Sequence, residues 1–244
     1  MERLLNKVAI VTGAAGGMGA SHARKFVEEG AKVVLTDLNE EAGKALANEL
    51  GENAMFIKQN VTSEADWENV VSETEKAFGP VNILVNNAGI SRNNSIEQTT
   101  LDQYLQIVNI NQVSVFLGMK SVVSSMKKVE NGSIVNISSM NGLVAGAIGY
   151  TDTKFAVRGM TKAAAMDFAR YGIRVNSVHP GVIETPMISS GDAVEAIKEF
   201  SKHIPLKRVA QSEEITNLVL FLASDESSYS TGSEFVADGG LTAQ

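Results

Sequence analysis

Tyr150 and Lys154, four positions apart, are the residues of this chain whose types and spacing best suit proton transfer. On a helix, such a pair lies on one face, one turn apart. The pKa of free tyrosine is about 10, so a tyrosine that passes protons at neutral pH needs its phenolate favoured by about 3–4 kcal/mol. A neighbouring ammonium supplies part of that energy. The same spacing also recurs by chance on solvated helix faces, so its meaning depends on the surrounding elements.

Short β-branched runs alternate with amphipathic helical stretches along the whole chain. The runs are mostly continuously apolar, as expected of strands buried on both faces of a parallel sheet. Repeated β-α-β units with right-handed crossovers then predict an α/β fold with a doubly wound parallel sheet. The predicted strands are residues 7–12, 32–36, 54–57, 82–85, 133–137, 174–178 and 234–237. The predicted helices are residues 17–29, 40–50, 64–78, 102–128, 150–170 and 212–223.

Composition excludes several classes of protein. The 244 residues carry a net charge of −7 without a basic stripe, which argues against nucleic acid and anionic membranes as partners. No linker divides the chain, so we expect one domain over residues 1–244. No cysteine is present, the apolar runs are too short to span a bilayer, and the first strand leaves no room for a signal peptide. We therefore expect a cytoplasmic protein. Its three histidines lack the spacing of zinc ligands.

Residues 12–19, Thr-Gly-Ala-Ala-Gly-Gly-Met-Gly, follow the first predicted strand and open the first predicted helix. This context is typical of a phosphate-binding turn, because glycines let the backbone approach a diphosphate and the helix start offers free N–H groups. A merely tight turn explains one glycine, but not four within seven positions. The spacing, with Gly13, Gly17 and Gly19, differs from the commoner Gly-x-Gly-x-x-Gly.

Asp37 ends the second predicted strand, 18 positions beyond Gly19. A carboxylate there can accept hydrogen bonds from the adenosine ribose of a dinucleotide and would repel a 2′-phosphate. No arginine or lysine occupies residues 14–19 or 37–39. The alternative is an aspartate that caps the helix beginning near Glu40. The sequence favours NAD over NADP.

Residues 186–208 form a long connection after the sixth strand, with a short helix predicted near residues 192–202. Long insertions at the carboxyl edge of such a sheet are often lids or specificity loops, although a packing insertion is the alternative.

Further motifs follow the other strands: Asn86-Asn87-Ala88-Gly89 after the fourth, Ser138-Ser139 after the fifth and Pro180-Gly181 after the sixth. With the glycine turn and Tyr150/Lys154, the whole chain resembles the short-chain dehydrogenase/reductase family, with the motifs in the family's order. The last fourteen residues resemble lactobacillus secondary-alcohol dehydrogenases, and residues 118–120 and 132–139 resemble bacterial hydroxysteroid dehydrogenases. The resemblance implies a single-domain Rossmann fold with a seven-stranded sheet and helices on both faces.

The resemblance also implies a catalytic tetrad of Asn111, Ser139, Tyr150 and Lys154. Tyr150 would be the acid in ketone reduction and the base in alcohol oxidation, and Ser139 would bind the substrate oxygen. Lys154 would hold the nicotinamide ribose and favour the phenolate, helped by the charge of the oxidised nicotinamide. Asn111 would hold open a helix and bind a water of a proton relay; from the residues alone it is a buried amide bonded to backbone. We expect Ser138 to be a structural hydroxyl at the strand end.

The cofactor contacts implied by the resemblance cluster at the strand ends. Thr185 would contact the diphosphate or carboxamide, although Pro180-Gly181 is by itself only a turn signal. The implied contacts are Gly13, Gly17, Met18, Gly19, Asp37, Leu38, Asn60, Val61, Asn87, Ala88, Gly89, Tyr150, Lys154, Pro180, Gly181, Ile183 and Thr185.

Three features depart from the family pattern. Asn60 stands where the family usually has an aspartate beside the adenine, and an amide oxygen can still accept from the adenine amino group. Ser139 and Tyr150 are 11 positions apart, two fewer than is typical of this branch, which alters the substrate pocket. Asp152 and Thr153 replace the usual alanine and serine, and an aspartate in the first turn suits the helix dipole.

These features predict an NAD(H)-dependent oxidoreductase acting on a secondary alcohol or ketone. The apolar pocket walls, expected from Met140, Asn141, Leu143, Ala145, Met187, Ile188 and residues 192–204, favour a hydrophobic or cyclic compound. The alternatives are an NADPH-dependent 3-oxoacyl (acyl-carrier) ketoreductase and a non-catalytic dinucleotide-sensing protein. Asp37 and the acidic charge balance disfavour the ketoreductase, and the retained tyrosine and lysine disfavour the sensor.

The resemblance alone implies a homotetramer, assembled through the helices at residues 102–128 and 150–170 and the C-terminal strand region. It also suggests that the terminal Gln244 contacts a structural Mg²⁺ ion, since a terminal carboxylate can ligate a hard cation. The alternative for this tail is simple interface packing.

Overall fold

The computed structural model describes residues 2–92, 94–129, 131–184, 197 and 199–243. Seven parallel strands form one sheet in the order β3-β2-β1-β4-β5-β6-β7. Their bounds are β1 Val8–Thr12, β2 Lys32–Asp37, β3 Ala54–Lys58, β4 Ile83–Asn86, β5 Ser133–Ile137, β6 Arg174–Pro180 and β7 Glu234–Ala237. The predicted seven-stranded parallel sheet is confirmed.

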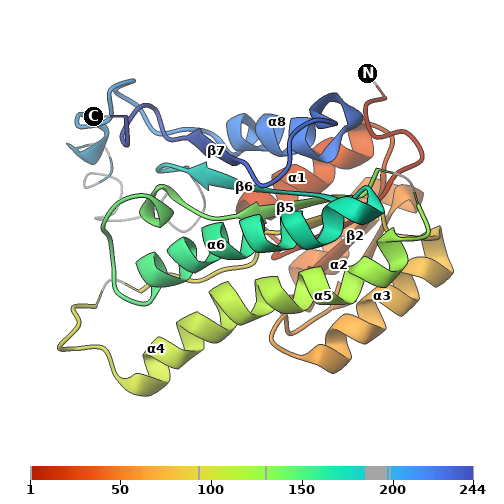
Figure 1. Ribbon diagram of the computed structural model, residues 1–244, viewed down its shortest axis with the longest axis horizontal. Helices are drawn as coiled ribbons and strands as arrows, with labels where there is room; N and C mark the ends of the chain where they lie inside the picture. The colour runs from red at the N-terminus through yellow and green to blue at the C-terminus, as the bar shows by residue number, and fades with distance from the viewer. Residues whose placement is uncertain (1, 93, 130, 185–196, 198, 244) are drawn as a thin grey trace.

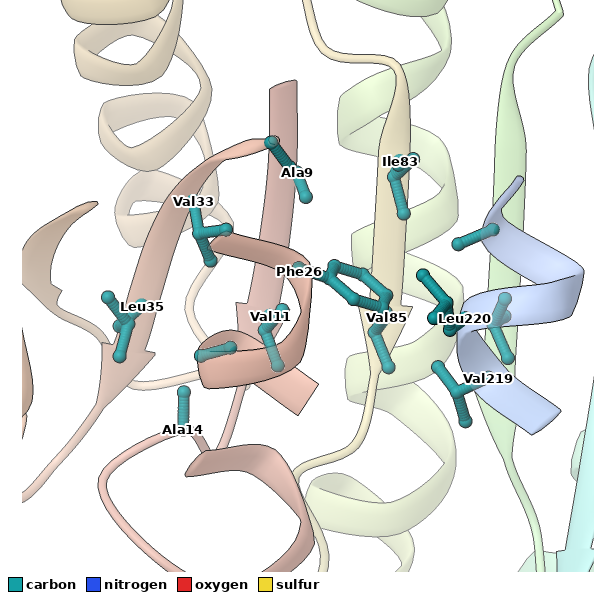
Figure 2. Packing of buried hydrophobic residues seen from close by; sticks show 14 of the residues in the cluster. Ala9, Val11, Ala14, Phe26, Val33, Leu35, Ile83, Val85, Val219 and Leu220 are labelled. Atoms are coloured by element: carbon teal, nitrogen blue, oxygen red, sulfur yellow. The ribbon is translucent and has the colours of Figure 1, made fainter. Parts of the chain in front are cut away.

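Helices cover both faces of this sheet (Figure 1). The α-helices are α1 Gly17–Glu28, α2 Glu40–Leu50, α3 Glu64–Phe78, α4 Leu101–Val108, α5 Ser114–Met126, α6 Tyr150–Phe168 and α8 Ser212–Ala223. Helices α1, α2 and α8 pack on one face, where Phe26 and Leu220 meet the side chains of β1 and β4 (Figure 2). Helices α3, α5 and α6 pack on the other face around Trp67. Continuous apolar strands are thus explained by a sheet buried on both sides.

The strand order reverses between β1 and β4, which are neighbours in the sheet although α1, β2, α2, β3 and α3 separate them in the chain. Because all seven strands are parallel, their carboxyl ends lie at one edge of the sheet. Ligands of doubly wound sheets bind at that edge, in the crevice where the strand order reverses. The motifs after β1, β4, β5 and β6 are therefore collected there.

The helix predicted over residues 102–128 is interrupted. Helix α4 ends at Val108, a π-helical segment spans Asn109–Val113, and α5 begins at Ser114. The helical stretch predicted over residues 102–128 is thus two α-helices joined by a π-helical segment, which contains Asn111, the residue that the resemblance implied would hold a helix open. In the connection after β6, residues 199–201 are helical, whereas most of the helix predicted near residues 192–202 lies outside the described residues. None of the described helices is long and apolar enough to cross a membrane.

Candidate active site

Helix α6 presents Tyr150 and Lys154 on one face, as the spacing predicts. The helix starts at Tyr150, after Gly149, whose φ of 80° lies in the left-handed region that glycine tolerates. The Lys154 ammonium lies 5.5 Å from the centre of the Tyr150 ring. Lys154 is buried and donates a 2.8 Å hydrogen bond to the carbonyl of Ile137, the last residue of β5. The lysine thus ties α6 to the end of β5.

Burial sets the direction of both pKa shifts in this pair. Burial lowers the pKa of Lys154 to about 8, because the charged ammonium loses hydration. Burial likewise raises the pKa of Tyr150, and the hydrogen bond with the Ser139 hydroxyl opposes this increase. The role of Lys154 in favouring the Tyr150 phenolate, which the resemblance implies for the site with oxidised nicotinamide bound, stays a prediction. The Lys154 ammonium is directed to the Ile137 carbonyl, and the Ser139 hydroxyl is the group whose hydrogen bond favours the Tyr150 phenolate.

The two serines after β5 have different partners. The Ser138 hydroxyl donates a 3.0 Å hydrogen bond to the carbonyl of Lys154 and so fastens the strand end to α6. The Ser139 hydroxyl accepts from the N–H of Asn141 at 3.1 Å and bonds to Tyr150. The bond of Ser138 is that of a structural hydroxyl at the strand end, whereas Ser139 is the serine beside Tyr150, and its predicted contact with the substrate oxygen stays a prediction.

Asn111 lies in the middle of the π-helical segment and is fully buried. Its amide clamps the main chain of Ile90, because Oδ1 accepts from the Ile90 N–H at 2.8 Å and Nδ2 donates to the Ile90 carbonyl at 2.8 Å. A β-carbon placed on Gly89 would lie 3.4 Å from Asn111 Oδ1 and 3.6 Å from Lys154 Nζ. Asn111 and Lys154 therefore both lie beside Gly89. Asn111 is a buried amide bonded to the backbone, as its residue type alone predicted.

The glycine turn and the turn after β4 are joined through Thr12. Its hydroxyl accepts from the N–H groups of Asn87 at 3.0 Å and Ala88 at 3.1 Å, and the Asn87 amide donates to the Thr12 and Gly13 carbonyls. A β-carbon on Gly13 would lie 2.9 Å from Ala88 Cα, and one on Gly19 would lie 2.2 Å from the Gly13 carbonyl oxygen. These two glycines are required by close packing of the turn itself.

The start of α1 is suited to an anion. No side chain caps it and its first turn holds no acidic residue, whereas α2 and α3 carry both a side-chain cap and acidic residues in the first turn. Uncapped N–H groups at a helix start attract phosphate. A β-carbon on Gly16 would meet nothing within 4 Å. This open, uncharged helix start fits the diphosphate of a dinucleotide.

Asp37 lies beside this turn. Its carboxylate accepts from the N–H of Ala15 at 3.1 Å and from the N–H of Asn39 at 2.9 Å. The residue that caps α2 is Asn39, whose side chain accepts from the Ala42 N–H. The alternative in which Asp37 caps this helix is therefore wrong, and its carboxylate remains at the carboxyl edge beside the glycine turn.

The remaining predicted contacts vary in position. Leu38 is 64% exposed, and the Asn60 side-chain oxygen accepts from the N–H and hydroxyl of Thr62, which closes a local turn. Val61 is buried. The first-turn glycine Gly17 has a φ of 53°, and Met18 follows it in α1.

The predicted contacts after β6 are held by the C-terminal part of the chain. Pro180 ends β6, Gly181 packs against the backbone of Asp238, and Ile183 pairs with Ala210 in an isolated bridge.

Some predicted residues cannot be placed. Thr185, Met187, Ile188 and Gln244 lie outside the described residues, as does most of the 186–208 connection. Within the described part of the chain, no group of three or more histidine, cysteine, aspartate or glutamate side chains could hold a metal ion. The Mg²⁺ contact at Gln244 stays a prediction.

Three contacts at the site carry no local sequence signal. Tyr104 of α4 donates a 2.6 Å hydrogen bond to the carboxylate of Asp152, whose other oxygen is buried without a partner. The Thr12 hydroxyl joins the glycine turn to the turn after β4. His179 of β6 bonds to the main-chain oxygen of Ser139. Of these residues, Asp152 alone was singled out in the sequence, because it replaces a residue type that is usual between the tyrosine and the lysine of the family.

Comparison with known proteins shows the family to which the chain belongs. Residues 13–242 match the family model described as enoyl-(acyl carrier protein) reductase. The chain belongs to the short-chain dehydrogenase/reductase family, whose oxidoreductases use a nicotinamide dinucleotide.

Three relatives cover nearly the whole chain. The chain is 50% identical to the 3-alpha-(or 20-beta)-hydroxysteroid dehydrogenase of Mycobacterium tuberculosis, over 99% of this chain and 91% of the relative. It is 44% identical to the cyclopentanol dehydrogenase of a Comamonas species, over 100% of both chains. It is 41% identical to the NADP-dependent (R)-specific alcohol dehydrogenase of Lentilactobacillus kefiri, over 100% of this chain and 99% of the relative. The resemblance to hydroxysteroid and lactobacillus-type alcohol dehydrogenases is confirmed.

Proposed function

We propose that this protein is an NAD-dependent dehydrogenase that transfers hydride between the nicotinamide and a secondary alcohol or ketone, with Tyr150 as the acid–base group. The observation that carries the proposal is the convergence of the Ser139 hydroxyl, Tyr150, Lys154 and the Asn111 clamp beside the glycine turn. Phenol, hydroxyl and ammonium are the groups needed to bind a carbonyl oxygen and exchange its proton.

Each side chain has one task in this mechanism. In ketone reduction Tyr150 donates its hydroxyl proton to the substrate oxygen, and in alcohol oxidation it accepts that proton. Ser139 donates a hydrogen bond to the same oxygen and stabilises charge that develops there. Lys154, with its ammonium held at the Ile137 carbonyl, is available to the nicotinamide ribose. When bound, the cofactor supplies or takes the hydride, and its oxidised form adds a positive charge that favours the Tyr150 phenolate.

Asp37 supports NAD as the cofactor. Its carboxylate lies at the glycine turn, and a 2′-phosphate near it would be repelled. No basic side chain occupies residues 14–19 or 37–39 to compensate. The NADP-dependent relative from Lentilactobacillus kefiri shows that this choice needs a direct test.

A hydrophobic, cyclic substrate is favoured by the relatives and by the residues near Tyr150. Two of the relatives are named for steroid and cyclopentanol substrates. On this chain, Met140 and Leu143 follow Ser139 within the shortened loop. Asn141 donates to the carbonyl of Ala145 at 2.9 Å and so holds this loop together.

The test is a panel of cyclic secondary alcohols, cyclic ketones, 3-hydroxysteroids and a 3-oxoacyl thioester, each with NAD(H) and NADP(H) at equal concentration. We expect turnover of cyclic alcohols and ketones with NAD(H) preferred. Turnover of the thioester with NADPH alone would support the acyl-carrier ketoreductase instead. Tight NADH binding without turnover of any compound would support a dinucleotide sensor.

A homotetramer is part of the proposal. Large apolar side chains are exposed on the helices expected at its interface, with Phe116 on α5 at 51%, Phe155 on α6 at 42% and Leu101 on α4 at 69%. Such side chains suit burial against further copies of the chain. Light scattering should give four times the 26.0 kDa mass of the chain, and a monomer at micromolar concentration would contradict the assembly.

A further inference from the structure

His179 is a fully buried side chain directly behind Ser139, and the mechanism above gives it no task. It is the last residue of β6 before Pro180. Both of its ring nitrogens have partners. Nδ1 lies 3.0 Å from the main-chain oxygen of Ser139, and Nε2 lies 3.0 Å from the hydroxyl oxygen of Ser177.

These partners define the tautomer of the ring. A carbonyl oxygen only accepts, so Nδ1 carries the proton and donates to Ser139, and Nε2 accepts from the Ser177 hydroxyl. The charged groups whose fields reach the ring are Lys154 and Arg158 of α6 and Glu234 of β7. Burial lowers the pKa of His179, so the ring is neutral at neutral pH and keeps this arrangement.

The histidine holds the chain one residue beyond the last hydrogen bond of the sheet. The N–H of Ser138 donates to the Val178 carbonyl at 2.8 Å, which is a regular bond between the parallel strands β5 and β6. The next bond of such a ladder would run from the N–H of residue 180 to the Ser138 carbonyl. Residue 180 is proline, which has no N–H, so the ladder ends where Ser139 begins. Beyond that point, the Ser139 carbonyl is held by the Gly142 N–H at 2.9 Å and by the imidazole.

We propose that His179 is a positioning residue for Ser139: its imidazole fixes the Ser139 main chain so that the hydroxyl stays within hydrogen-bonding reach of Tyr150. The inference rests on the proposed function, because it gives His179 a role in positioning a residue of that same site. Ser139 has an extended backbone, with φ −170° and ψ 163°, and leads into a single short turn over residues 140–142. Without the imidazole, one N–H group at 2.9 Å and the strand end would be all that orients its carbonyl.

The test compares variants that keep or remove this one hydrogen bond. In His179→Asn the amide nitrogen can take the place of Nδ1 and donate to Ser139, whereas His179→Leu has a similar volume and no donor. Ser177→Ala is the matched control, since it removes the partner of Nε2 and leaves the bond to Ser139. Each protein is assayed for thermal unfolding, NADH affinity, kcat and KM in cyclic-ketone reduction, and the pH dependence of alcohol oxidation.

We expect His179→Leu to bind NADH within about twofold of wild type and to lose at least about tenfold in kcat, because small misplacements of a reacting group have large effects on rate. The alkaline midpoint of oxidation should also move to higher pH, since the Ser139 bond opposes the rise in the pKa of Tyr150. His179→Asn should recover both properties to within about threefold of wild type, and Ser177→Ala should leave both unchanged.

A folded His179→Leu protein with wild-type kcat and an unmoved pH midpoint would overturn the assignment. So would a His179→Asn protein that is as slow as His179→Leu. If His179→Leu does not fold, His179→Gln replaces it, because the longer amide reaches the Nε2 position and not the Nδ1 position. Wild-type protein without turnover would overturn the proposed function as well, whereas an active wild type with an unaffected His179→Leu would overturn the role of His179 alone.

Discussion

Acid should loosen the packing of α1, the helix that opens at the glycine turn, through the buried side chain of His22. This residue is fully buried against α8, and its Nδ1 lies 2.7 Å from the hydroxyl of Thr216. Its Nε2 is buried without a partner. A proton added there would place a charge in the core, so burial lowers the pKa of His22 from 6.5 to about 3.

The sign and size of the effect follow from proton linkage. Between about pH 6.5 and 3 the unfolded chain binds a proton at His22 that the folded protein does not, so the free energy of unfolding falls as the pH falls through this window. Each pH unit corresponds to about 1.4 kcal/mol. Between about pH 7.5 and 5 the loss due to His22 is about 2 kcal/mol, and below both pKa values it approaches about 5 kcal/mol.

The assay is urea unfolding of wild type and His22→Leu at several pH values over that range. His22→Leu removes the titrating group, so its stability should fall by about 2 kcal/mol less than that of wild type between pH 7.5 and 5. Subtracting the free energy of unfolding of His22→Leu from that of wild type at each pH removes the contributions of His179 and of the carboxylates, which both proteins share. His203→Gln is the control, because His203 is exposed and its replacement should leave the wild-type dependence in place. Parallel stability curves for wild type and His22→Leu would refute the reasoning.

Two further predictions concern the cofactor and the catalytic helix. The double variant Asp37→Ser/Gly16→Arg should raise the ratio of kcat/KM with NADPH to kcat/KM with NADH by at least about tenfold. The carboxylate that would repel the 2′-phosphate is lost, and the added guanidinium enters open space beside the glycine turn. An unchanged ratio would contradict the role of Asp37. Tyr104→Phe should lower the free energy of unfolding by about 1–3 kcal/mol, since it leaves the second Asp152 carboxylate oxygen without its donor. The double variant Tyr104→Phe/Asp152→Asn should lose less free energy of unfolding than the sum of the losses in the two single variants. Strictly additive losses would show that the two residues are not coupled.

The fold and the main site residues were predictable because they depend on local patterns. Continuous apolar runs identify strands of a buried parallel sheet, and their parallel direction collects Ser139 and the glycine turn at one edge. The Tyr150–Lys154 spacing becomes a shared helix face as soon as α6 forms. The resemblance to the family adds the roles of Ser139 and Asn111.

The remaining features depend on contacts between distant segments. The π-helical turn at Asn109–Val113 contains the buried Asn111, whose amide bonds to the main chain of Ile90, 21 positions away, and an apolar helical pattern does not indicate such a contact. The pKa of Tyr150 depends on how deeply α6 packs, which spacing alone does not indicate. The hydrogen bonds of His179 to Ser139 and of Tyr104 to Asp152 join residues 40 and 48 positions apart and appear only when the strands and helices are assembled.

The most direct test of the central claim follows the hydride and the tyrosine together. Wild type and Tyr150→Phe are incubated with a cyclic ketone and NADH deuterated at both C4 positions, and the alcohol product is analysed by mass spectrometry. The account predicts one deuterium at the carbinol carbon with wild type and a rate at least about 100-fold lower with Tyr150→Phe at unchanged NADH affinity. Product without deuterium, or wild-type turnover by Tyr150→Phe, would contradict it.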